Sequence, residues 1–99
     1  MKPTNSRVGP EDIADVARLV DTTSARVLWY FWENRHARLD ELTKLVGESS
    51  PMNVLLRIRD VINPAAEQVL GKPILVFEKS ALDYHTGEHI FHSWWLFST

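Results

Sequence analysis

The sequence predicts an α+β domain in which several helices are followed by a β-hairpin. Apolar residues recur at the spacing of an amphipathic helix over the first two thirds of the chain, whereas after Pro73 they follow the two-residue period of a strand. The tripeptide His85-Thr86-Gly87 divides this last segment into two strands, at 74–84 and 88–97. We therefore expect a helical core with one face of the hairpin packed against it.

Length and composition are those of a single globular domain. The chain has 99 residues, of which 44% are hydrophobic and 24% are charged. We expect a flexible arm at residues 1–9 and one folded domain at 10–99. There is no cysteine, which excludes disulfides and thiolate metal sites. The N-terminus lacks the apolar core of a signal peptide, and the longest apolar run, Val27–Trp32, is too short to span a bilayer. These features predict a cytoplasmic protein with no membrane contact.

The first two helices are expected before residue 36. Pro10 suits the first position of a helix. The second helix, from about Ala25 to Arg35 with Thr23 or Ser24 as its N-cap, contains the nearly continuous apolar sequence VLWYFW. Such a helix is central to the core or presents an aromatic side chain to a partner. The sequence favours the core for most of these aromatics, with at least one left for an interface from among Trp29, Tyr30 and Trp32.

A short capped helix follows an extended link at 37–39. Asp40 is a suitable N-cap, and Leu42, Leu45 and Val46 share one helix face. Gly47 comes directly after them, where a left-handed residue commonly ends a helix. We therefore predict a helix of about two turns.

The next helix is predicted to begin with Ser50 as N-cap and Pro51 at the first position. Its apolar residues recur at helical spacing until Asn63-Pro64, which is expected to stop it because the residue before proline disfavours the α region. Asn63 then caps a further short helix that ends at Gly71. Two helices joined by a tight turn form the helix-turn-helix pattern, although two packed helices without any nucleic-acid role produce the same periodicity.

A three-residue turn fixes the predicted hairpin register. A type I turn followed by a left-handed Gly87 suits this loop. The register would place Asp83 opposite His89, where the two side chains could form a hydrogen bond or a weak ion pair. The other predicted pairs are Tyr84 with Glu88, Ala81 with Phe91, Phe77 with Trp95, and Leu75 with Phe97.

From about Ala25 to Phe97 the chain resembles the winged helix-turn-helix superfamily, in the manner of small archaeal and bacterial regulators. The segments that carry the resemblance are RLDELTKLVG as supporting helix, SSPMNVLLRIRDVIN as recognition helix, and 74–97 as wing. The chain differs from the family in the inserted PAAEQVLG segment and in the acidic, His-bearing wing tip DYHTGEH. The resemblance implies a homodimeric DNA-binding transcription regulator without a cofactor.

Double-stranded DNA is the partner expected from this resemblance. The recognition helix would enter the major groove, with Asn53 suited to adenine and Arg57 to guanine or phosphate. Because charges over residues 37–63 cancel, no basic stripe is evident, and DNA binding requires the cations to converge on one surface. The alternative is that these charges are simply solvated. The candidate DNA-binding residues are Arg38, Lys44, Ser49, Ser50, Asn53, Arg57 and Arg59.

A protein-interaction module is the rival interpretation, with dimerisation or adaptor contacts and no DNA binding. The missing basic stripe and the abundance of Trp favour it, because Trp and Tyr concentrate binding energy at interfaces. The candidate interface residues are Ile13, Val16 and Val20 on one face of the first helix, with Trp29, Trp32 and Trp94.

Metal binding and catalysis are poorly supported. His85, His89 and His92 lie close in sequence, but His89 and His92 fall on opposite faces of a strand. A role for these histidines in pH sensing stays open. There is no nucleophile elbow, Gly-rich phosphate loop or pair of carboxylates on one helix face, so we expect neither an enzyme nor a metal site.

Overall fold

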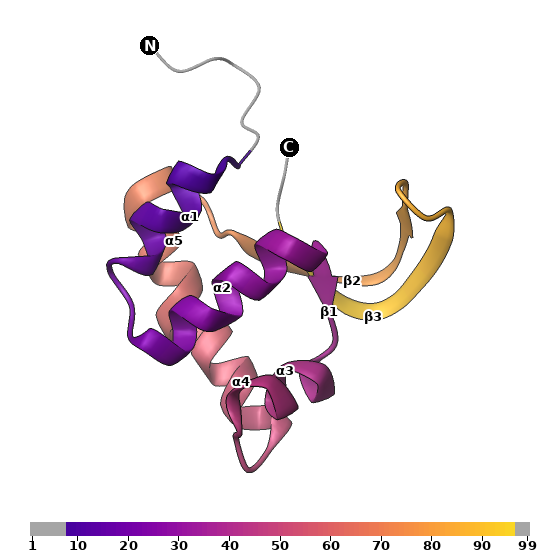
Figure 1. Ribbon diagram of the computed structural model, residues 1–99, viewed down its shortest axis with the longest axis horizontal. Helices are drawn as coiled ribbons and strands as arrows, with labels where there is room; N and C mark the ends of the chain where they lie inside the picture. Colours follow the sequence, from indigo (N-terminus) through magenta and orange to yellow (C-terminus); the bar gives the residue numbers. More distant parts are fainter. Residues whose placement is uncertain (1–7, 97–99) are drawn as a thin grey trace.

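Figure 1 shows the computed structural model, which describes residues 8–96. The α+β class is as predicted. Most of the predicted arm, residues 1–7, lies outside the described residues, and so does Phe97. The elements are, in order, α1 (Pro10–Ala17), α2 (Thr22–Asn34), β1 (His36–Ala37), α3 (Leu39–Val46), α4 (Pro51–Arg57), the π-helical turn η1 (Ile58–Ile62), α5 (Asn63–Leu70), β2 (Leu75–Asp83) and β3 (Glu88–Leu96).

The helices form the body of the molecule, and the hairpin of β2 and β3 projects from one side and curls (Figure 1). The sheet is antiparallel with strand order β1-β3-β2. Its short outer strand β1 pairs His36 with Trp95 and Ala37 with Trp94. The predicted extended link at 37–39 therefore begins one residue earlier, and α3 already starts at Leu39. None of the described helices is long and apolar enough to cross a bilayer.

The N-terminus of α2 differs from the prediction. Asp21, rather than Thr23 or Ser24, is the N-cap. Its carboxylate accepts the Ser24 backbone N–H at 3.3 Å and the Ser24 hydroxyl at 2.7 Å. A carboxylate that satisfies two donors at a helix start outcompetes a hydroxyl cap, so α2 begins at Thr22, three residues before the predicted Ala25.

The two short helices predicted at 38–63 begin as α3 and α4, with a shifted first cap. Arg38, not Asp40, is the N-cap of α3, and the Glu41 carboxylate accepts the Arg38 backbone N–H at 3.1 Å. Asp40 instead lies in the first turn, where an acid favours the positive end of the helix dipole. Gly47 adopts the predicted left-handed conformation, with φ of 71°. Pro51 occupies the first position of α4 after Ser50, as predicted.

The helix after this turn does not stop at Asn63-Pro64, which corrects the prediction. α4, η1 and α5 follow one another without a break, and Asn63 keeps helical φ and ψ of −65° and −39°. Its N–H donates to the carbonyl of Ile58, five residues back, which is the π-helical pattern. A wider turn here accommodates Pro64, which has no N–H and whose ring would clash with the carbonyl four residues earlier in a regular α-helix.

Asn63 therefore does not cap a separate helix but joins the long helix to the sheet. Its side-chain amide donates to the carbonyl of Leu75 at 2.9 Å. Its side-chain oxygen accepts the backbone N–H groups of Ile74 and Leu75 at 3.1 and 3.0 Å. These three bonds fix where β2 begins.

The predicted hairpin register is wrong by one residue. Asp83 pairs with Glu88, and Phe77 pairs with Trp94 rather than Trp95. The N–H groups of Thr86 and Gly87 both donate to the Asp83 carbonyl, at 3.2 and 2.7 Å, which closes the turn one residue earlier than expected. Gly87 is left-handed, as predicted, with φ of 77°. Because the shift is one residue, β3 is turned over relative to the prediction. The remaining predicted pairs are replaced by Leu75 with Leu96, Ala81 with Ile90, and Leu82 with His89.

The core lies between the helices and the base of the sheet. Ile13 and Val16 of α1 are fully buried in it, so the prediction that they face a partner is wrong. α1 is packed against α2 and α5, and its apolar face is used within the chain. The other fully buried apolar residues are Val27, Leu28, Phe31, Ala37, Leu42, Val54, Ile58, Ile62, Ala66 and Ile74.

Candidate functional site

Arg57 does not project from the exposed face of α4, where DNA reading would require it. Its guanidinium donates to Asp21 at 2.7 Å, to the Ser24 hydroxyl at 3.0 Å and to Glu48 at 2.8 Å. The side chain is 22% exposed. The hydrogen bond to Glu48, and then the charges of both carboxylates, hold the pKa of Arg57 above its usual value. Arg57 thus ties the turn before α4 to the start of α2.

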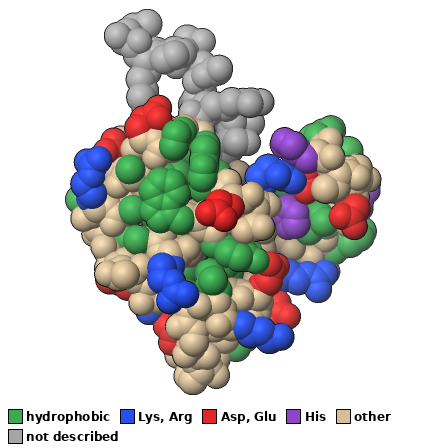
Figure 2. All heavy atoms as spheres, viewed as in Figure 1, with side chains coloured by type: hydrophobic (Ala, Val, Ile, Leu, Met, Phe, Trp, Pro, Cys, Tyr) green, Lys and Arg blue, Asp and Glu red, His purple; other side chains and the backbone are tan. Residues whose placement is uncertain are grey.

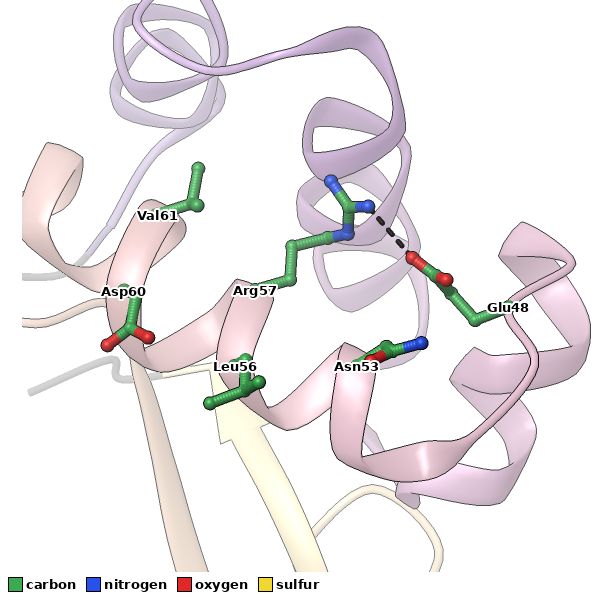
Figure 3. Close-up of a pocket in the computed structure, with 6 residues that line it drawn as sticks. All are labelled: Glu48, Asn53, Leu56, Arg57, Asp60 and Val61. Atoms are coloured by element: carbon green, nitrogen blue, oxygen red, sulfur yellow. Dashed lines mark hydrogen bonds and ion pairs between the residues drawn. The ribbon is translucent and has the colours of Figure 1, made fainter.

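Three large apolar side chains remain exposed on α4 and η1. Met52, Leu56 and Val61 are 57%, 37% and 37% exposed. We call this surface the α4 face. Figure 3 shows Arg57 directed at Glu48, with Leu56 and Asp60 projecting away from that pair. A shallow hollow of about 390 Å³ lies here, lined by Glu48, Asn53, Leu56, Arg57, Asp60 and Val61.

The other three predicted cations differ from Arg57 and from one another in their surroundings. Arg59 pairs with the adjacent Asp60 at 3.1 Å, on the surface. Arg38 reaches toward β3, where its guanidinium donates to the Phe91 carbonyl at 3.4 Å. Lys44 is exposed in the last turn of α3. In Figure 2 the Lys and Arg side chains on the visible face are scattered near Asp and Glu rather than gathered in one patch. On this face, the described residues do not show the convergence of cations that DNA binding requires.

The polar residues at the start of α4 are close to one another but are partly engaged. The Asn53 side-chain amide donates to the Ser49 hydroxyl at 3.3 Å, and both residues are exposed. Ser50 is half-buried at the N-cap position. The fold thus brings these polar residues of the predicted DNA-binding set together at a surface, and Asn53 also lines one hollow with Arg57.

The predicted aromatic interface is divided between core and surface. Trp29 is 37% exposed, whereas Trp32 and Val20 are partly buried against the core. Figure 2 shows hydrophobic side chains gathered over α1 and α2. Tyr30 is not available as a free anchor, because its hydroxyl donates to Glu41, and this bond raises the pKa of Tyr30.

Trp94 is separated from this group, on the hairpin. Its ring meets Phe77 edge-on, with 5.7 Å between the ring centroids. Both rings line a second hollow, of about 260 Å³, with Arg38 and His92. The six predicted interface residues therefore do not form one continuous surface.

An ion pair that was not predicted, with a buried carboxylate and a partly exposed guanidinium, joins the hairpin to α2. Arg35 Nη2 donates to both carboxylate oxygens of Asp83, at 2.9 and 2.8 Å, and Asp83 is only 2% exposed. The same carboxylate accepts the His85 backbone N–H at 3.0 Å and lies 3.3 Å from His36 Nε2. Burial raises the pKa of Asp83, but the His85 N–H and then Arg35 outweigh it, and the pKa is lowered. The predicted contact between Asp83 and His89 is thereby corrected.

The histidines are distributed over separate contacts. His36 packs on Trp95 with 4.6 Å between ring centroids, and His89 stacks on Phe91 at 6.0 Å. Within residues 8–96 no three His, Cys, Asp or Glu side chains are grouped so that they could hold a metal ion.

Comparison with known proteins found no match among protein-family models, curated proteins or solved structures.

Proposed function

We propose that this chain is a winged-helix domain that binds another protein through the α4 face instead of reading DNA. The winged-helix assignment is supported by the order of elements, a helix-turn-helix pair followed by a hairpin. It is also supported by the way β3 lies between β2 and the short β1 that precedes the pair.

The ionic contacts of Arg57 carry the functional part of the proposal. Phosphate contacts by Lys and Arg supply most of the affinity of a DNA-binding domain. Here the cation in the middle of the recognition-helix equivalent is held by Asp21 and Glu48 at 2.7 and 2.8 Å. Freeing it for phosphate would leave two carboxylates unpaired near the docking surface, which would repel DNA.

The α4 face instead has exposed apolar side chains that a protein partner could cover. Met52, Leu56 and Val61 supply exposed side chains, and the charged residues beside them are paired, Arg59 with Asp60 and Arg57 with Glu48. Interfaces between proteins typically have such an apolar centre inside a polar rim. The partner that fits is a protein segment that places an apolar anchor side chain in the hollow beside Leu56 and Val61.

A pair of lysine substitutions tests this assignment. Leu56→Lys places a charge in the centre of the α4 face, whereas Gln68→Lys places the same charge on the exposed side of α5. Both proteins should keep the circular dichroism spectrum and unfolding midpoint of the wild type. After cross-linking in an extract of the source cells, mass spectrometry should find the same partner with wild type and Gln68→Lys, but not with Leu56→Lys. Equal recovery of that partner by all three proteins would exclude the α4 face as its binding site.

A further inference from the structure

The second hollow, of about 260 Å³, lies between the start of α3 and the hairpin. It shares no residue with the hollow on the α4 face, so a ligand bound here is independent of the partner proposed above. Its charged side chains belong to exposed residues, which a molecule from solution can reach. The lining residues are Arg38, Leu39, Asp40, Phe77, His92 and Trp94.

Two opposite charges border this hollow, and they are not paired with each other. In the described chain the Arg38 guanidinium makes one long hydrogen bond, to the Phe91 carbonyl at 3.4 Å, and no ion pair. Over the same residues the Asp40 carboxylate takes part in neither a hydrogen bond nor an ion pair. The nearby Glu41 carboxylate is bonded to Tyr30 and to the Arg38 N–H, and it does not line the hollow. The hollow therefore presents a cation and an anion that can each accept a partner.

The hairpin side of the hollow is aromatic. Phe77 is 46% exposed, and its ring meets that of the half-buried Trp94 edge-on, with 5.7 Å between the ring centroids. A ligand that covers these rings would remove a large apolar area from water, which favours binding. The same ligand would lie beside both charges.

His92 adds a strained backbone to this hollow. Its φ is 52°, a value that non-glycine residues rarely adopt, and the residues on either side of it pair with β2 whereas His92 does not. Strain of this kind is retained mostly at sites that hold ligands or perform chemistry. Since an imidazole is ordinarily uncharged above about pH 7, the charge of the hollow is then that of Arg38 and Asp40.

This combination of charges selects the ligand. A molecule with a single charge would be attracted by one of the two side chains and repelled by the other, whereas a zwitterion can pair with both. Since one water molecule takes up about 30 Å³ in the liquid, the hollow has room for an organic molecule of roughly ten non-hydrogen atoms. We propose that it binds a free amino acid with a large apolar side chain. The carboxylate would pair with Arg38, the ammonium with Asp40, and the side chain would pack on Phe77 and Trp94.

Three ligands with the same aromatic body separate the two charges. L-phenylalanine carries a carboxylate and an ammonium, 3-phenylpropionate carries only the carboxylate, and phenethylamine carries only the ammonium. Each is titrated into the wild type at about pH 7.5 and low salt, into the millimolar range because ligands of this size bind weakly. We expect L-phenylalanine to shift the ¹H–¹⁵N signals of residues 38–40 and 91–94. Each analogue should bind about fivefold more weakly, because it lacks one partly exposed ion pair.

Two variants locate the contacts. Arg38→Gln should weaken the binding of L-phenylalanine and 3-phenylpropionate but not of phenethylamine, and Asp40→Asn should weaken L-phenylalanine and phenethylamine but not 3-phenylpropionate. Lys44→Gln, which removes an exposed cation from the other end of α3, is the matched control and should leave all three affinities unchanged.

The comparison of ligands uses the wild type alone, so it holds whether or not each variant folds. If L-phenylalanine shifts none of these signals, or if either analogue binds as tightly as L-phenylalanine, the proposal is wrong. Folded Arg38→Gln and Asp40→Asn proteins that bind L-phenylalanine as the wild type does would overturn it equally.

Discussion

The carboxylate of Asp83 and the guanidinium of Arg35 are 48 residues apart in sequence and 2.8 Å apart in space. This contact connects the end of β2, beside the hairpin turn, to the end of α2. The hairpin that it joins to α2 projects from the helices and curls (Figure 1). The Asp83 side chain is 3% exposed and that of Arg35 is 36% exposed. The carboxylate is therefore the buried, fixed member of the pair, and the guanidinium reaches it from the surface.

Replacement of Asp83 should loosen the hairpin. In Asp83→Ala the His85 N–H loses its acceptor and the Arg35 guanidinium loses its counter-charge, so we expect a clear fall in the urea midpoint of unfolding. Amide exchange should increase most in residues 82–90. Glu88→Ala, the exposed residue opposite on β3, is the control and should change neither quantity appreciably. If both variants lower the midpoint equally, the buried pair is not what holds the hairpin.

The lowered pKa of Asp83 also predicts how stability depends on pH. A carboxyl with a folded-state pKa below its unfolded value, near 3.8, contributes stability that is complete above the unfolded value and is lost as pH falls through the folded one. Asp21, whose pKa is lowered chiefly by the Ser24 hydroxyl, acts in the same direction. Urea denaturation between pH 7 and pH 2 should therefore show a loss of stability below about pH 4. That loss should be smaller in Asp83→Asn, and an unchanged acid dependence would contradict it.

Asn63 should matter more for stability than its half-buried position indicates. Asn63→Leu removes the three hydrogen bonds that join α5 to the start of β2 and leaves two backbone N–H groups without their acceptor, a cost of about 2 kcal/mol. Asn63→Asp keeps the accepting oxygen and should fall between wild type and Asn63→Leu. The free energy of unfolding in urea measures both; equal stability of Asn63→Leu and wild type would show that the bonds contribute nothing.

The contacts of Arg57 predict a structural effect for its removal. Arg57→Met keeps the apolar part of the side chain and releases Asp21 and Glu48, so we expect the free energy of unfolding to fall by about 1–2 kcal/mol. The exposed pair of Arg59 and Asp60 provides the comparison: Arg59→Met should change stability by no more than about 0.5 kcal/mol. The prediction fails if the two substitutions have the same effect.

Self-association of the chain is still expected, but through a smaller set of residues than the sequence indicated. With Ile13 and Val16 in the core, the large apolar side chains of α1, α2 and the loop between them that stay exposed are Leu19 and Trp29. Light scattering at tens of micromolar should give the mass of a dimer for the wild type and of a monomer for Trp29→Glu. A monomeric wild type at that concentration would rule out the dimer.

Local signals in the sequence predicted the fold well where one residue decides the local geometry. Gly47, Pro51 and Gly87 mark a helix end, a helix start and a hairpin turn where they were expected. The prediction that the helix stops at Asn63-Pro64 was wrong, because a π-helical turn allows a helix to continue through a proline that would break a regular α-helix. The predicted hairpin register was wrong because the N–H groups of Thr86 and Gly87 both bond to the Asp83 carbonyl. The spacing of residues in the sequence does not distinguish this turn from one that closes on the next residue.

The site was harder to predict, since it depends on contacts between distant residues. At helical spacing Asn53 and Arg57 share a face, but the Arg57 side chain turns back to carboxylates from two other segments. Nothing in the sequence pairs Asp21 or Glu48 with Arg57, or Arg35 with Asp83. Val61 belongs to the helical apolar pattern that the sequence shows, and Leu56 stands outside that pattern. That both side chains are exposed follows only from how the rest of the helix packs.

Binding to random duplex DNA tests the central claim most directly. Fluorescence anisotropy of labelled duplex, titrated with protein at about 50 and 200 mM salt, measures whether phosphates are neutralised. We predict no saturable binding at the lower salt concentration with the wild type, with Arg57→Met or with Leu56→Lys. Binding of the wild type that falls steeply with salt and is lost in Arg57→Met would show that Arg57 leaves its carboxylates to contact DNA. The α4 face would then be a DNA-binding surface after all.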